Sequence, residues 1–377
     1  MLVVYRINKS KFNVFATGRV SRLRTCHTLM IAVMVASFLG GCTQFGPRML
    51  TSGRPLYNIA VQETESQQLL LNIVRQRYSD PILFLDVTSI SSGFNRQASA
   101  GILGSTSNNN LGGTLGGSIS ESPFITYAPN MGEAFVRQMM TPLDIYTLAL
   151  IVQAGWSIER TLLIVGESIN QLRNTPGDTN PQTGYLMFHQ AVSSLRDLQR
   201  AGKLSLGAES AQDGAEPHLA LLVAADAVNS EPYRKVCESL KVACDGRPLK
   251  LRQGIGPSTD DETIVLATRS LFSAMYFLSQ GVEVPAADAA ARFASNSPVV
   301  AGGPFDKAGT GETLFRVHSS AEEPELAAVK VFYRGSWFYI ADNDADSKVT
   351  FALVSMMVML QSGDTAKITP LITIPVG

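Results

Sequence analysis

The sequence contains few of the residues on which catalysis usually depends. It has only four histidines, no phosphate-binding loop, no H-E-x-x-H motif and no G-x-S-x-G motif. Beyond the N-terminal leader, His189, His218 and His318 lie far apart, without ligand residues at metal-binding spacing. We therefore predict that each is structural or on the surface, and that the chain uses no metal or other cofactor. A Ser-His-Asp site assembled from distant residues is the alternative, because such sites form only in space.

The sequence also has no apolar run long enough to cross a membrane. The apolar segment 29–39 is shorter than the roughly 20 residues that a spanning helix needs. Six basic residues and no acidic one precede Cys42. A basic leader followed by a short apolar segment is typical of a secretory signal.

The leader ends in Leu39-Gly40-Gly41-Cys42, which resembles the cleavage box of bacterial lipoproteins. The resemblance implies cleavage after Gly41, a diacylglycerol on the Cys42 sulfur and a stable membrane anchor. A plain signal peptide is the alternative. Because Thr43 rather than Asp follows the cysteine, we expect attachment at the periplasmic face of the outer membrane.

Nothing in the charge of the mature chain suggests nucleic acid as a partner. Six of the 31 Lys and Arg residues precede Cys42, so 25 remain against 32 Asp and Glu residues, a net charge of −7. A chain of that sign is repelled by phosphate backbones.

Two cysteines, Cys237 and Cys244, remain for the mature chain if Cys26 is removed with the leader and Cys42 carries lipid. An even pair in an oxidising compartment predicts a disulfide. On one unbroken helix their Cα atoms would lie about 10.5 Å apart, beyond the usual ~4.4–6.8 Å. The prediction therefore requires a helix that ends near residues 240–242. Two free buried thiols are the alternative.

The hydrophobic patterns predict an α+β fold of mixed helices and short, mainly antiparallel sheets. Residues 94–121 are rich in Gly and Ser and alternate with period two on both sides of residues 106–110, which predicts an inserted β-hairpin. The polar, Gly-rich stretch 201–217 is the expected boundary between two halves. The predicted divisions are a signal peptide 1–41, a tether 42–55, an N-terminal α+β half 56–205 and a C-terminal α+β half 206–377.

Periodicity and turn residues also locate individual elements. The predicted helices are 56–78, 132–141, 142–155, 182–200, 231–240, 262–280 and 347–361. The predicted strands are 82–90, 161–166, 218–224, 249–252 and 367–376, and residues 327–341 form a hairpin with Arg334 and Gly335 at its turn.

Two segments near the C-terminus are candidates for binding. Tyr333, Arg334, Trp337 and Tyr339 form an aromatic-rich hairpin that suits stacking on a sugar or peptide, although core packing is the more common use of such residues. Asp342, Asp344 and Asp346 have the 1,3,5 spacing of a calcium loop. The rest of that motif fails, because serine and leucine replace the required glycine and glutamate. We therefore predict no metal there, and instead a helix cap at Asp346 or Ser347.

Three segments, Leu69–Val87, Arg269–Pro285 and Tyr333–Val354, resemble an uncharacterised family of proteobacterial lipoproteins. The resemblance implies an envelope location and no assigned activity. We therefore expect a non-enzymatic assembly or interaction subunit of a periplasmic or outer-membrane complex, with envelope proteins or further copies of this chain as partners. A module that binds peptidoglycan or another glycan is the first alternative, and a periplasmic hydrolase with an unrecognised site is the second.

Overall fold

A computed structural model of the chain describes residues 45–104, 111–130, 132–175, 182–209, 218–291, 293–294, 314–362 and 372–375. It confirms the α+β class, with mixed helices and mainly antiparallel strands. The chain forms two compact units. We call the unit containing residues 85–128 the hairpin unit, and the unit containing residues 62–84 and 129–368 the main unit. The predicted signal peptide 1–41 and Cys42 lie outside the described residues.

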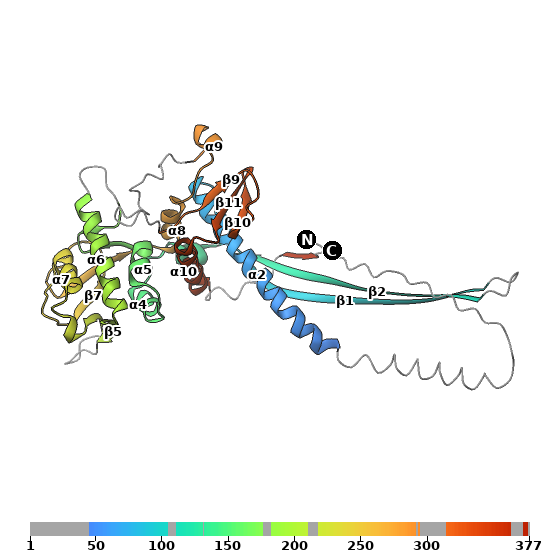
Figure 1. The fold of residues 1–377 in the computed structure, drawn as a ribbon, viewed down its shortest axis with the longest axis horizontal. Coiled ribbons are helices and arrows are strands. Elements are labelled where there is room, and N and C mark those ends of the chain that lie inside the picture. The colour runs from blue at the N-terminus through green and yellow to red at the C-terminus, as the bar shows by residue number, and fades with distance from the viewer. Residues whose placement is uncertain are drawn as a thin grey trace. The chain divides into compact units, whose positions relative to one another are not determined.

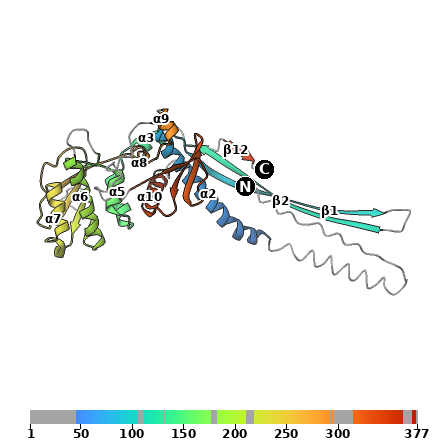
Figure 2. The same ribbon diagram turned by 45° about the horizontal axis from the view of Figure 1, so that its top comes forward.

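The hairpin unit is built on two long strands, β1 (Leu85–Gly104) and β2 (Leu111–Pro129), which are hydrogen-bonded to each other. They run side by side in both views of the ribbon (Figures 1 and 2). A short strand, β12 (Ile372–Pro375), pairs antiparallel with β2 over residues 124–127. The predicted hairpin is thus confirmed, but it is longer than 94–121 because the predicted strand 82–90 continues into it.

The first helix, α2, spans Phe45–Arg77 and begins before the predicted start at residue 56. Most of the predicted tether 42–55 is therefore helical. Pro47 lies in the first turn, where a proline costs no hydrogen bond, and was the sequence signal for this earlier start. Pro55 lies in the helix interior, where proline is usually unfavourable, and this misled the prediction.

A six-stranded sheet forms the centre of the main unit, in the order β4-β3-β8-β7-β6-β5. Only β7 and β8 are parallel among its described pairs, and β8 is buried along nearly its whole length, as expected for an inner strand. The strand bounds are β3 Gly166–Ile169, β4 Leu172–Arg173, β5 Leu204–Glu209, β6 His218–Val223, β7 Leu249–Gln253 and β8 Thr263–Thr268.

This sheet corrects the predicted boundary between residues 205 and 206. Strand β5 pairs with β6 from Leu204 opposite Val223 to Glu209 opposite His218, and β3 pairs with β8. Strands from both predicted halves therefore share one sheet, and the polar stretch between β5 and β6 does not separate two cores.

Helices of the main unit pack on this sheet and on one another, with α6 in contact with both α5 and α7. The predicted bounds of α6 and α7 are confirmed. The helices are α3 Glu133–Met140, α4 Ile145–Gln153, α5 Ile158–Val165, α6 Gln182–Arg200, α7 Glu231–Leu240, α8 Leu271–Ser279, α9 Ala286–Ala290 and α10 Ala345–Ser362, with a 3-10 turn at Ala225–Ala227.

Three predicted elements were wrong or misplaced. Residues 161–166 were predicted as a strand, but they belong mainly to α5, which Ser157 caps by accepting a hydrogen bond from the Arg160 amide. The predicted helix 262–280 is in fact the strand β8 followed by the helix α8. Residues 263–268 include several β-branched side chains, which favour a strand, and Ser270 then caps α8 by accepting a hydrogen bond from the Ser273 amide. The helix expected from Pro142 begins at Ile145, and Asp144 is its cap.

A second sheet of the main unit has the order β10-β11-β9 and contains the predicted C-terminal hairpin. Its strands are β9 His318–Ser320, β10 Ala327–Tyr333 and β11 Ser336–Ala341. Arg334 and Gly335 have φ values of 49° and 84°. These values are typical of the tight two-residue turn that connects antiparallel strands, as the sequence predicted.

Arg269 holds the junction between α5 and the central sheet. It follows β8 and is 6% exposed. Its guanidinium donates to the carbonyl oxygens of Ile164, Gly166 and Asn174 at 3.0, 2.8 and 2.9 Å, and it lies over the ring of Phe277. Burial lowers the pKa of Arg269. The charge is favourable here because a helix C-terminus carries partial negative charge and unpaired carbonyl groups.

Cys237 and Cys244 lie at disulfide distance, as predicted, with their Cα atoms 5.7 Å apart. Helix α7 ends at Leu240, within the range 240–242 that the bridge requires. Lys241 adopts a left-handed conformation with φ 56°, which reverses the direction of the chain. Because a bridge over so short a loop restricts the unfolded chain, we expect Cys237→Ala with Cys244→Ala to lower the free energy of unfolding by about 2 kcal/mol. Urea denaturation measures this loss. Two reactive thiols in denatured, unreduced protein would contradict the bridge.

Candidate functional site

The predicted aromatic binding surface is divided between two faces of the β9–β11 sheet. Tyr333 lies opposite Ser336, and Phe332 lies opposite Trp337, so Tyr333 and Trp337 point to opposite faces. Phe338 and Ile340, on the inner face, are fully buried. The four predicted residues therefore do not form one surface.

The outward residues of this sheet form what we call the outer aromatic face. Phe332 is 57% exposed, and its ring lies 5.2 Å from that of Trp337 between centroids. The next row pairs Tyr339 with His318, whose rings are 5.4 Å apart. Lys330 places its ammonium group 5.9 Å from the Trp337 ring centre. The predicted Trp337 and Tyr339 belong to this face. Phe332 was missed, although counting back from the Arg334-Gly335 turn would have placed it opposite Trp337.

Tyr333 and Arg334 instead fasten the hairpin to the end of α2. The Tyr333 hydroxyl donates to the Asp80 carboxylate at 2.6 Å, and Arg334 lies over the ring of Tyr78 at 5.0 Å. Tyr78 in turn donates to Asp288 at 2.7 Å. Burial and this hydrogen bond raise the pKa of Tyr78. These contacts show that Tyr333 and Arg334 hold the hairpin against the end of α2 and do not belong to the outer aromatic face.

The three aspartates with calcium-like spacing do not converge. Asp342 pairs with Lys348 at 2.7 Å, and Asp346 pairs with Arg160. Asp344 accepts hydrogen bonds from the backbone amide and hydroxyl of Ser347, at 3.0 and 2.6 Å. Asp344 is therefore the cap of α10, in place of the predicted Asp346 or Ser347. Within the described ranges no group of three or more His, Cys, Asp or Glu side chains is placed to hold a metal ion.

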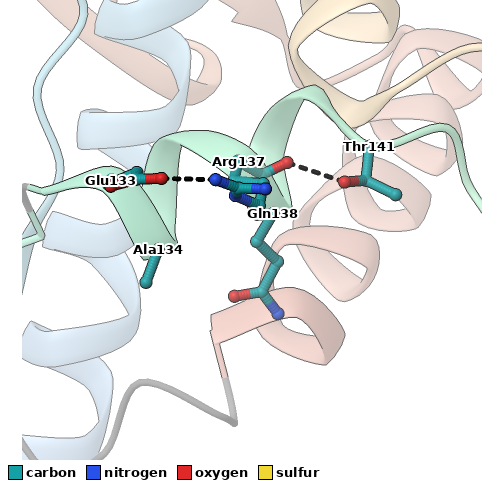
Figure 3. Close-up of a pocket in the computed structure, with 5 residues that line it drawn as sticks. All are labelled: Glu133, Ala134, Arg137, Gln138 and Thr141. Carbon is teal, nitrogen blue, oxygen red and sulfur yellow. Dashed lines mark hydrogen bonds and ion pairs between the residues drawn. The ribbon is translucent and has the colours of Figure 1, made fainter.

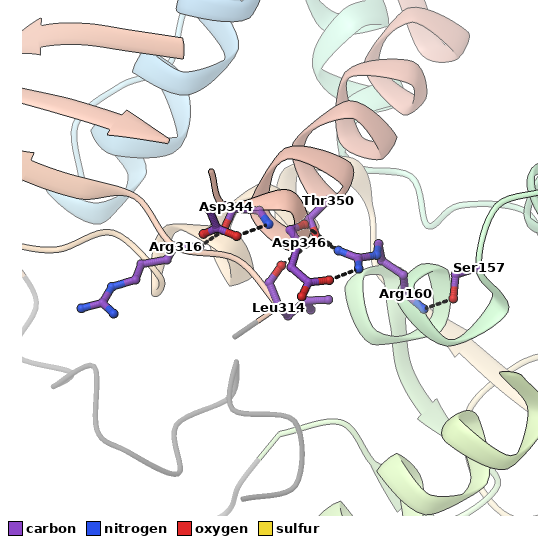
Figure 4. Close-up of polar contacts among 8 residues, drawn as sticks. Ser157, Arg160, Leu314, Arg316, Asp344, Asp346 and Thr350 are labelled. Atoms are coloured by element: carbon purple, nitrogen blue, oxygen red, sulfur yellow. Dashed lines mark hydrogen bonds and ion pairs between the residues drawn. The ribbon is translucent and has the colours of Figure 1, made fainter. Parts of the chain in front are cut away.

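Of the three, Asp346 belongs to a polar junction between α5 and α10 (Figure 4). The Arg160 guanidinium contacts the Asp346 carboxylate and donates to the Asp346 carbonyl and the Thr350 hydroxyl at 2.6 and 2.7 Å. Thr350 passes a hydrogen bond to the Leu314 carbonyl at 2.7 Å. Each of the three aspartates therefore has its own local partner, and their 1,3,5 spacing reflects structural contacts and not a shared site.

An apolar groove lies between the α3–α4 connection, α4 and the C-terminal part of α10. Its volume is about 550 Å³. Leu143 and Ile151 are buried, whereas Leu150 and Leu360 are 64% and 56% exposed. We call this the apolar groove, and it is lined by Gln138, Thr141, Pro142, Leu143, Asp144, Thr147, Leu150, Ile151, Ala154, Met356, Leu360 and Gln361. The sequence did not predict it, because its walls come from segments about 200 residues apart.

Two further hollows lack convergent free groups. One, of about 560 Å³, is lined by α3 and the residue after it, where Arg137 pairs with Glu133 and the Thr141 hydroxyl donates to the Arg137 carbonyl (Figure 3). The other, of about 420 Å³, lies beside Trp156 and contains three arginines. Of these, Arg160 belongs to the α5–α10 junction and Arg196 donates to Gln199 at 2.7 Å.

The three predicted structural histidines lie in separate places. His318 lies 3.2 Å from the Glu283 carboxylate, as the base and acid of a triad would, but this carboxylate also pairs with Arg316 at 2.6 Å. No described serine or cysteine side chain is hydrogen-bonded to it in a position to act as a nucleophile. His218 begins β6. His189 is 6% exposed, lies against the ring of Tyr185 at 4.2 Å, and has its pKa lowered by burial to about 4.

His189 is expected to make the protein less stable in mild acid. Its pKa is about 4 when folded and near the usual ~6.5 when unfolded, so the unfolded chain gains the proton first as the pH falls. This lost stability develops between pH 6.5 and 4, and amounts to about 2 kcal/mol between pH 7 and pH 5. Urea denaturation at both pH values measures it.

Two variants of α6 separate the titration of His189 from a general loss of packing: His189→Leu removes the titrating group, and Phe188→Leu is the packing control. His189→Leu should reduce the difference between the two pH values by about 2 kcal/mol. Phe188→Leu should lower stability by a similar amount at both. An unchanged pH difference in His189→Leu would rule out this histidine as the cause.

Comparisons with family models, curated proteins and solved structures find no match to this chain. Among the residues that the structure describes, no helix combines the length and apolar character needed to cross a membrane.

Proposed function

We propose that this chain is a non-enzymatic, lipid-anchored protein of the bacterial envelope, and that it serves as an interaction subunit of a complex at the periplasmic face of the outer membrane. The observation that carries this proposal is the apolar groove, where Leu150 and Leu360 are exposed beside a buried floor. Exposed apolar side chains around a concave surface are typical of a protein-binding site. The lipoprotein box at Leu39–Cys42 supports the location.

The shape and composition of the groove favour an amphipathic helix of another envelope protein as its occupant. Two helices, α4 and α10, form its walls, and polar groups of Gln138, Asp144 and Gln361 lie among its apolar residues. A partner helix would place apolar residues at i, i+3, i+4 and i+7 against this floor. Burial of a leucine side chain contributes about 1.5–3 kcal/mol, so two exposed leucines supply a useful part of the affinity.

Lipidation of Cys42 is tested by the location and mass of the mature chain. Cys42→Ser is expected to move the protein from the membrane fraction to the soluble periplasmic fraction, because no lipid then holds it. Mass spectrometry of the wild-type N-terminus should find an acylated Cys42. A mature chain that begins at Thr43, or one with an unmodified Cys42 thiol, would contradict the anchor.

The groove is tested by photo-cross-linking in cells from a reactive residue placed at Thr147. We expect one main adduct with another envelope protein, reduced at least tenfold by Leu150→Asp with Leu360→Asp, because two carboxylates would have to be desolvated. Leu186→Asp is the matched control, since Leu186 is an exposed leucine on α6 outside the groove. An adduct that persists in the double variant, or no adduct at all, would contradict the proposal.

The outer aromatic face favours glycan binding as a second candidate. Phe332 and Trp337 provide adjacent rings on an open sheet surface, and aromatic rings of this kind stack on sugars. Co-sedimentation with purified peptidoglycan tests this function. Trp337→Ala should reduce the bound fraction at least fivefold, whereas the groove variants should not change it. Equal binding by wild type and Trp337→Ala would exclude this face.

A further inference from the structure

The hairpin unit presents long open strand edges. Strand β1 has 20 residues, and β2 is its one strand neighbour among the described residues. The other edge of β2 is covered by β12 only at residues 124–127. Residues 111–123 of β2 and residues 86–104 of β1 therefore form a two-stranded ribbon with backbone groups directed outward on both sides. Such a ribbon is marginally stable alone.

These edges have few of the features by which proteins usually prevent strands from pairing between molecules. In β1 the only charged residues are Asp86 and Arg96, and the strand contains neither lysine nor proline. Residues 111–120 of β2 contain no charged residue and no proline, and Glu121 and Pro123 occur only at the end of the open edge, beside the residues that pair with β12. Lysine, proline, inward charges and very short strands are the usual protection of an exposed edge. Long unprotected edges are therefore expected to acquire a partner strand.

We infer that the partner is a second copy of this chain, and that the outer edge of β1 pairs with the outer edge of β2 in the neighbouring copy. Strands β1 and β2 are joined by residues 105–110 and run antiparallel. When neighbouring hairpins point in the same direction, β1 of one copy is antiparallel to β2 of the next. In this arrangement both outer edges of each hairpin are paired, one with the preceding copy and one with the next. A strand from an unrelated protein would pair with only one of the two edges.

This pairing joins two different surfaces, so it repeats from copy to copy and ends only when a ring closes. It goes beyond the proposed function, because it involves neither the apolar groove nor the outer aromatic face.

The mass of the full chain in mild detergent is the first test. Native mass spectrometry should give a multiple of the 40.6 kDa chain, less the leader if it is cleaved. Deletion of residues 97–120 should return a single-chain mass, and Leu150→Asp with Leu360→Asp should keep the multiple. Wild-type protein that is monomeric at all concentrations, or a deletion variant that stays assembled, would overturn the inference.

Mixed cross-linking tests the pairing itself and does not depend on how the deletion variant folds. In the lipidated full chain, one tagged copy carries Gln97→Cys and a differently tagged copy carries Ser118→Cys, because the acylated Cys42 sulfur and the Cys237–Cys244 pair leave no natural thiol to react. Gln97 lies seven residues before the end of β1, and Ser118 lies seven after the start of β2. A short thiol-to-thiol cross-linker with a reach of about 6 Å should join the two kinds of copy across strands about 4.8 Å apart, even with a one-residue shift in register, and it is too short for like strands, which lie about 9.6 Å apart.

We expect at least fivefold more product between unlike copies than between like copies. A predominance of β1-to-β1 product, or no product, would overturn the pairing. If the protein is monomeric and yet forms the groove adduct, the inference fails while the proposed function stands. If the protein is assembled but forms no groove adduct, the proposed function fails while the inference stands.

Discussion

Replacement of Arg269 by alanine is expected to lower the free energy of unfolding by about 3–5 kcal/mol. The substitution removes a side chain that is 6% exposed and takes away the donors that pair the carbonyls of Ile164, Gly166 and Asn174. The Gly166 carbonyl keeps a second donor, the Asn174 side-chain amide at 2.9 Å, whereas the Ile164 and Asn174 carbonyls lose the donor that Arg269 supplies. The loss has two causes, a cavity beside Phe277 and unpaired buried acceptors. Urea denaturation monitored by circular dichroism measures it.

Two further arginine variants separate the geometry of this group from its charge. Arg269→Lys keeps the charge at the helix end but has no planar set of donors, so we expect an intermediate loss of about 2 kcal/mol. Arg247 pairs with both Asp245 and Glu262, but its side chain is 60% exposed. Arg247→Ala should therefore leave stability nearly unchanged. If Arg269→Ala cost less than Arg269→Lys, the hydrogen bonds would not be the cause.

Phe338→Ala is the second substitution from which we expect a large effect, about 3–5 kcal/mol of lost stability. Phe338 is fully buried on the inner face of β11, and its ring lies edge-on to Tyr78 at 6.1 Å between centroids. The cavity would weaken the attachment of the β9–β11 sheet to the end of α2. Chemical denaturation measures the loss. Because Tyr78 also packs against Tyr333, the hydrogen bond from Tyr333 to Asp80 should be weakened as well.

Trp337→Ala is the matched control on the opposite face of the same strand. Trp337 lies in the outer aromatic face, so its removal should cost about 1 kcal/mol, mostly from its contacts with Phe332 and Lys330. The pair thus compares adjacent aromatic residues that differ in the face they occupy. Equal losses from Phe338→Ala and Trp337→Ala would contradict the assignment of inner and outer faces.

Local sequence signals predicted those elements whose stability is decided locally. The bounds of α6 and α7 follow from helical periodicity, and a proline in the first turn and Ser230 as cap help to begin α7. Two residues with positive φ fix the turn of the C-terminal hairpin, so its existence and register could be predicted. The end of α7 near Leu240 followed from the distance that a cysteine bridge requires.

Tertiary contacts decided the rest. Residues 161–166 have the apolar β-branched composition of a strand, but capping by Ser157 and burial against α6 make them helical. The apolar groove depends on α4 and α10 meeting in space, which no local pattern specifies. The sequence predicted Asp346 as a helix cap. Its actual partner, Arg160, could not be predicted because it lies 186 residues away in the chain. The sequence predicted the aromatic binding residues as a set, but only strand parity separates them into two faces.

The order of strands in the central sheet has a consequence for the rate and timing of folding. Strand β3 pairs on one side with β4, the edge strand, which follows it directly in the chain. Its neighbour on the other side, β8, comes about 100 residues later. A chain that emerges from its N-terminus cannot complete this sheet until residue 268 has appeared, whereas β5, β6 and β7 can pair as soon as they emerge. Pairing of strands that are far apart in the sequence slows folding. The chain must lose the conformational entropy of the intervening loop before the strands gain any contact. The edge of β3 that pairs with β8 therefore stays unpaired until the last residues of β8 have been made.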